Sequence, residues 1–125
     1  MTLAEFLLAR IAEDEKAAAD CDAASGYTIW EHDSDGEVGT ANALVSHPVR
    51  VAYAEHIAKH DPFRVLAECE AKRRIVALSQ VEGTAQFPNY EGGYESGWED
   101  ASSDAVRLLA LPYADHPDYQ PEWRV

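Results

Sequence analysis

The chain has 125 residues, of which 46% are hydrophobic, and its acidic residues outnumber the basic ones by 23 to 10, giving a formal net charge of −13. A single domain of this length has few large apolar side chains to bury, so we expect a thin core that self-association could supplement. The strong acidity argues against unaided binding to phosphate backbones or anionic membranes.

The chain opens with an amphipathic pattern that predicts a helix over residues 2–20. Thr2 and Glu5 fit a capping box, in which each side chain accepts a hydrogen bond from the backbone N–H of the other residue. The apolar residues of this segment recur at helical spacing and form one stripe: Leu3, Phe6, Leu7 and Ile11. We expect the first helix to pack through this stripe.

A stretch of β-forming residues follows the first helix. Residues 27–32 alternate in the manner of a strand. Residues 33–36 read Asp-Ser-Asp-Gly, a turn in which Gly36 supplies the positive φ angle. Residues 37–40 can pair back as a second strand, and residues 44–46 add a third extended piece. The stretch therefore predicts a β-hairpin or a small antiparallel sheet.

Asp61 and Pro62 mark a sharp corner in the middle of the chain. Proline lacks the N–H that would be orphaned in a first helical turn, and the aspartate carboxylate can accept from the N–H groups that remain. Pro62 also keeps Asp61 out of the helical conformation. We therefore expect one helix over residues 52–60 and a longer one over 62–80. Cys69 falls on the apolar stripe of the longer helix and should lie in the core.

The next stretch predicts a long acidic loop. Residues 82–102 contain several glycines and a proline, which break a regular period. Three aromatic residues nevertheless recur every four positions there: Tyr90, Tyr94 and Trp98. A last helix should follow, capped by Asp100 or Ser103 and stopped by Pro112.

The C-terminal residues 112–125 predict a strap stiffened by three prolines. A stiff segment with large aromatic side chains loses little conformational entropy when it docks. We therefore expect it to pack across the surface of the protein's body or of a second subunit. The candidate residues for interaction with a partner are Arg64, Arg73, Tyr113, Tyr119 and Trp123.

The two cysteines indicate a reducing compartment. Cys21 and Cys69 are far apart and lack a CxxC spacing, and the chain has neither a signal peptide nor an apolar run near 18 residues. We therefore expect a cytoplasmic protein with reduced thiols and no membrane contact. Cys21, which follows the first helix, is expected to be exposed.

Two histidines one helical turn apart raise the question of a metal. His56 and His60 can face one ion together, and His116 of the tail is a third candidate ligand for zinc. The structural alternative packs His60 at the helix corner, leaves His56 on a polar face and makes His116 part of a turn held by Asp118. We expect no cofactor, with zinc at these three histidines as the alternative.

No catalytic signature stands out in the chain. It lacks a phosphate-binding glycine loop, a G-x-S-x-G motif and the glutamate base of an HExxH helix. Direct nucleic-acid binding would rest on Lys72, Arg73 and Arg74, a weak footprint in so acidic a chain. The sequence leans away from an enzyme without deciding the matter.

Two long motifs carry a resemblance to a known family. Residues 56–75 read HIAKHDPFRVLAECEAKRRI, and residues 108–124 read LLALPYADHPDYQPEWR. The chain resembles an uncharacterised family of small proteins from actinobacteria and their phages, a domain of unknown function. Residues 24–50 and 82–102 look like its variable parts. The family carries no assigned activity, so the resemblance implies a bacterial or phage-infected cytoplasm and no mechanism.

These observations predict a single α+β domain over residues 1–125, with about three helices, a small antiparallel sheet and the C-terminal strap. The leading function is a non-enzymatic accessory or interaction protein that binds another protein or, as a homodimer, a second copy of itself. The first alternative is a zinc-binding protein with a hydrolytic role. The second is an acidic DNA mimic that inhibits a nucleic-acid-binding protein.

Overall fold

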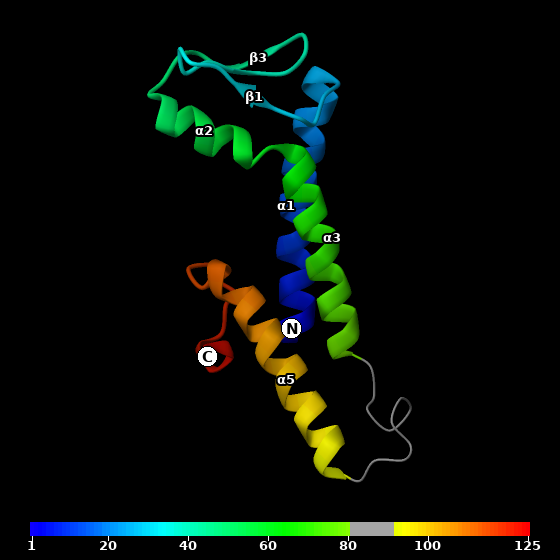
Figure 1. The fold of residues 1–125 in the computed structure, drawn as a ribbon. Helices are drawn as coiled ribbons and strands as arrows, with labels where there is room; N and C mark the ends of the chain where they lie inside the picture. The colour runs from blue at the N-terminus through cyan, green and yellow to red at the C-terminus, as the bar shows by residue number, and fades with distance from the viewer. Residues whose placement is uncertain (81–91) are drawn as a thin grey trace. The chain divides into compact units, whose positions relative to one another are not determined.

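A computed structural model describes residues 1–80 and 92–125 (Figure 1). The described residues contain α-helices and one three-stranded antiparallel sheet, which confirms the α+β class. The α-helices are α1 (Leu3–Ser25), α2 (Val51–Lys59), α3 (Pro62–Ser79) and α5 (Gly92–Ala110). The strands are β1 (Glu31–His32), β2 (Val38–Gly39) and β3 (Leu44–Ser46), and two 3-10 turns follow α5: η1 (Leu111–Tyr113) and η2 (Pro121–Trp123). Within the described parts of the chain, no helix has the length and apolarity needed to cross a membrane.

The chain divides into two compact units. The central unit is Ala12–Cys69, and the terminal unit combines Met1–Ile11 with Glu70–Val125. Each unit contains one part of α1 and one part of α3. The single domain predicted from the sequence stays a prediction.

The central unit is built on the small sheet and α2. The strands lie in the order β1-β2-β3, and His32 is the antiparallel partner of Val38. Helix α2 lies along the sheet (Figure 1). Val38 and Ala54 are fully buried between the two, and Ala58 is 9% exposed. Because these core residues are small, the predicted thin core is confirmed here.

Gly36 is held where a side chain would not fit. It closes the predicted turn with a φ of +84°, and its carbonyl accepts a hydrogen bond of 3.0 Å from the N–H of Val49. A Cβ atom at Gly36 would lie 1.7 Å from the carbonyl oxygen of Val49. Both the left-handed backbone and the close approach of two chain segments therefore require glycine.

The terminal unit begins with the predicted capping box. The N–H of Thr2 donates to Glu5 Oε2 at 2.9 Å, and the N–H of Glu5 donates to Thr2 Oγ1 at 3.1 Å. The predicted stripe is also confirmed, because Phe6, Leu7 and Ile11 are fully buried.

An aromatic cluster joins the strap to the first helix within the terminal unit. Trp123 is 8% exposed, and its ring centroid lies 5.1 Å from that of Phe6 and 5.6 Å from that of Tyr119. The ring of Phe6 also meets His116 at 5.5 Å, edge to face. The strap therefore docks on the body of the protein, as the prolines and aromatic residues predicted.

The predicted loop over residues 82–102 requires a correction. Residues 81–91, including Tyr90, lie outside the described residues, but α5 begins at Gly92, so the expectation of a loop was wrong for residues 92–102. Each glycine costs a helix only about 1 kcal/mol, whereas each residue added to an existing helix gains a hydrogen bond. The buried Val106 and Ala110 hold the C-terminal half of α5 in place, and the helix continues from there towards its N-terminal residue, Gly92.

Replacing Trp123 by alanine should lower the free energy of unfolding by about 3–5 kcal/mol, because it leaves a cavity beside Phe6. Urea unfolding followed by circular dichroism measures this. The matched control is Leu108→Ala, whose side chain is 55% exposed and whose loss should change stability by about 0.5 kcal/mol or less. Equal effects of the two variants would contradict the cluster.

Replacing Gly36 by alanine should break the hydrogen bond from Val49, since the new Cβ displaces that segment. Amide hydrogen exchange at Val49 should become faster. Gly26→Ala is the control, because Gly26 also has a positive φ, +73°, but nothing lies within 4 Å of its Cβ position. This control should lose about 1–3 kcal/mol from backbone strain alone, with the exchange at Val49 unchanged relative to its neighbours.

Candidate functional site

The candidate site is built around the corner between α2 and α3. Asp61 is 8% exposed and caps α3, because its Oδ1 accepts from the N–H of Arg64 at 2.9 Å. Its Oδ2 accepts from the N–H of Trp30 at 3.1 Å. The N–H of Phe63 donates to the carbonyl of Thr28 at 3.0 Å. The corner therefore confirms the predicted cap and also fastens residues 28–30 to the start of α3.

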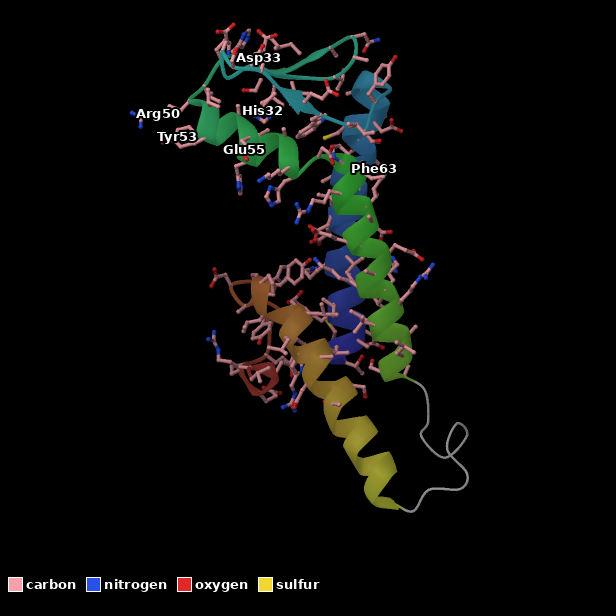
Figure 2. All side chains as sticks on the ribbon, in the orientation of Figure 1. His32, Asp33, Arg50, Tyr53, Glu55 and Phe63 are labelled. Atoms are coloured by element: carbon pink, nitrogen blue, oxygen red, sulfur yellow. The ribbon has the colours of Figure 1, made fainter. Side chains whose placement is uncertain are left out.

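This fastening leaves large apolar side chains facing outward. Thr28 and Trp30 are half-buried, whereas Tyr27 is 42% exposed and Ile29 is 56% exposed, the alternation of an extended segment. The backbone of Phe63 lies beside this segment, because its N–H is bonded to Thr28. The side chain of Phe63 is 61% exposed, and Figure 2 labels it at the first turn of α3. We call Tyr27, Ile29 and Phe63 the outer apolar surface.

The outer apolar surface lies in a strongly acidic unit. The central unit holds twelve acidic residues and four basic ones. The segment that continues from the outer apolar surface carries four exposed carboxylates and no basic residue: Glu31, Asp33, Asp35 and Glu37. A partner of this surface would meet apolar and negative groups together.

The two central histidines do come together. The ring centroids of His56 and His60 lie 4.3 Å apart, and both side chains are exposed. His60 Nδ1 donates to the carbonyl oxygen of His56 at 2.8 Å. Because a carbonyl only accepts, this bond puts the proton of a neutral His60 ring on Nδ1 and leaves the Nε2 lone pair available.

The third predicted metal ligand has a different environment. His116 belongs to the terminal unit, where its Nε2 faces the guanidinium of Arg10 and its ring packs on Phe6. The N–H of Asp118 donates to His116 Nδ1 at 3.0 Å, so a local bond closes this turn through the side chain of His116 and the backbone of Asp118. In the parts of the chain that the structure describes, no group of three or more His, Cys, Asp or Glu residues is arranged to hold a metal ion. The zinc hypothesis with all three histidines stays a prediction.

A cavity of about 260 Å³ lies beside the corner in the central unit. Polar groups on its wall come from Asp14, Cys21 and His60, and the remainder comes from Ala17, Ala18, Trp30, Pro62 and Val65. Cys21 is half-buried there rather than exposed as expected. Sequence reasoning missed this cavity because its wall comes from segments far apart in the chain, and no spacing pattern links them.

A shallower depression of about 430 Å³ lies between β1 and α2. It is lined by Trp30, Glu31, His32, Glu55, Ala58 and Lys59. The pKa of Glu55 is lowered, because Lys59 donates a hydrogen bond to its carboxylate at 3.1 Å and places a positive charge beside it. Both side chains are well exposed, so this pair adds little to stability.

The predicted interaction residues fall in several environments. Arg64 donates to Glu68 at 2.9 Å across one turn of α3, and Arg73 is half-buried farther along that helix. The ammonium of Lys72 lies 5.8 Å from the ring centroid of Tyr113. Tyr119 and Trp123 belong to the aromatic cluster around Phe6. A role of these five residues in partner binding stays a prediction.

Replacing Asp61 by alanine should lower the free energy of unfolding by about 2–3 kcal/mol, because the N–H groups of Trp30 and Arg64 lose their acceptor. Urea unfolding followed by circular dichroism gives the value. Asp35→Ala removes an exposed carboxylate and should cost about 0.5 kcal/mol or less. A loss at Asp61 no larger than this control would show that the corner does not depend on the carboxylate.

Comparison with known proteins gives one match. The model of a family described as "Family of unknown function (DUF6221)" matches residues 1–125, the whole chain. No curated protein and no solved structure matches it. The chain therefore belongs to the family of unknown function DUF6221.

Proposed function

We propose that this protein is a non-enzymatic interaction protein that binds a basic protein partner through the outer apolar surface. The observation that carries the proposal is the exposure of Tyr27, Ile29 and Phe63 around one backbone hydrogen bond, that of Phe63 to Thr28. These residues are held by a hydrogen bond within the folded protein, so little conformational entropy would be lost in ordering them when a partner binds.

The energetics favour a partner for this surface. Burial of apolar area contributes about 25 cal/mol per Å², and an aromatic side chain buries about 150–250 Å². Phe63 is 61% exposed, so covering it alone is worth on the order of 2 kcal/mol. Aromatic anchors at the centre of an interface, surrounded by polar groups, typically supply most of the binding energy.

The charge of the central unit favours a basic partner. Twelve acidic residues against four basic ones speed the approach of a positively charged protein and oppose the approach of an acidic one. The DNA-mimic hypothesis shares the charge argument but does not use the apolar residues.

Photo-crosslinking tests the proposal. A photoreactive phenylalanine analogue at position 63 should capture a basic protein in the cells that make this chain, whereas the same analogue at position 108, 55% exposed in the terminal unit, should not. The captured partner is then purified and its Kd measured. Phe63→Ser should weaken binding by about tenfold or more, and Leu108→Ser by less than about twofold.

Salt provides a second readout for the same pair of proteins. Because complementary charges steer the association, the association rate should fall as ionic strength rises. A partner with an acidic surface, or one whose affinity is the same for Phe63→Ser and for the wild-type chain, would overturn the proposal.

A further inference from the structure

We infer that a divalent transition-metal ion joins two copies of this chain through His56 and His60, at the C-terminal end of α2. The inference goes beyond the proposed function, because it concerns another face of the central unit and a second copy of the same chain. It is independent of the outer apolar surface, and none of its residues belongs to that surface.

The two imidazole rings lie side by side. His56 lies in the last turn of α2, His60 is the residue that follows the helix, and their ring centroids are 4.3 Å apart. His60 Nδ1 donates to the backbone carbonyl of His56, which fixes the orientation of the His60 ring and leaves Nε2 to bind a metal. This kind of second bond is the usual support of a metal-binding histidine.

The histidines belong to an exposed stripe that runs along α2 and past its C-terminal end. Tyr53, His56 and His60 lie at i, i+3 and i+7, and Tyr53 is 58% exposed. Ala54 and Ala58 occupy the opposite, buried side of the helix against the sheet. Tyr53 is labelled near the start of α2, where its side chain projects from the helix (Figure 2). The stripe is therefore accessible to another molecule along most of the helix.

A second copy completes the coordination. Zinc in structural sites is bound by four ligands in tetrahedral geometry, and one chain supplies two imidazoles here. In residues 1–80 and 92–125, no third His, Cys, Asp or Glu stands close enough to this pair to form a three-ligand group. A two-fold axis across the stripe would bring two such pairs face to face and supply four nitrogens. Tyr53 of each copy would flank the ion.

The charge of the chain explains why the pairing would need a metal. Two central units, each with twelve acidic and four basic residues, repel each other. The ammonium of Lys59, next to His60, is bound to Glu55 at 3.1 Å, so its charge near the ion is offset. A dication between the two stripes attracts both copies. The inference therefore predicts a dimer with zinc and a monomer without it.

The experiment is sedimentation of the untagged full-length chain during titration with zinc chloride, with bound zinc measured in parallel. The wild-type chain should change from monomer to dimer at one zinc ion per two chains and return to monomer when a chelator is added. His56→Gln should abolish both the dimer and the zinc uptake, because it removes one ligand while keeping the backbone carbonyl that His60 uses.

His47→Gln is the matched control, since His47 is also exposed, precedes α2 and has no part in the stripe. It should dimerise with zinc as the wild-type chain does, and circular dichroism should show both variants folded. A monomer in the presence of zinc, one zinc ion bound per monomer, a dimer that forms without zinc, or a zinc-dependent dimer that persists in His56→Gln would each overturn the inference.

Discussion

The central unit depends on the pair of hydrogen bonds that the Asp61 carboxylate accepts. Asp61 is almost fully buried, and the two oxygens of its carboxylate accept from backbone N–H groups of Trp30 and Arg64, which are far apart in the sequence. A hydrogen bond to a charged acceptor is stronger than one to a neutral acceptor, and a buried N–H that loses its acceptor is costly. One side chain thus caps the start of α3 and holds the segment that leads into the sheet.

The central unit buries small residues and exposes large ones. Val38, Ala54 and Ala58 make its core, while Ile29 and Phe63 remain more than half exposed. Such a core supports only a small sheet of two- and three-residue strands. The exposed aromatic and aliphatic groups follow from the same geometry, because Thr28 is bonded to the N–H of Phe63 and Trp30 to the carboxylate of Asp61, which leaves the alternate side chains facing outward.

The terminal unit uses its large residues in the opposite way. Phe6, Tyr119 and Trp123 pack against one another, and the guanidinium of Arg10 lies 5.2 Å from the Phe6 ring centroid. The strap is thereby part of the fold. This contrast gives the two units different tasks in our proposal: aromatic packing holds the terminal unit together, and the central unit presents its apolar and imidazole groups to other molecules.

The sequence by itself determined the features that are decided within a few residues of the chain. The capping box at Thr2, the turn hydrogen bond from Gly36 to Asp33 and the cap of α3 by Asp61 each join residues no more than four positions apart, so their residue types were sufficient. Only the tertiary structure decided the helix that begins at Gly92, the bond between Thr28 and Phe63, and the cavity beside Cys21. Local preferences of about 1 kcal/mol per residue are outweighed by packing and by hydrogen bonds between distant segments, and no short-range pattern records which distant segments will meet.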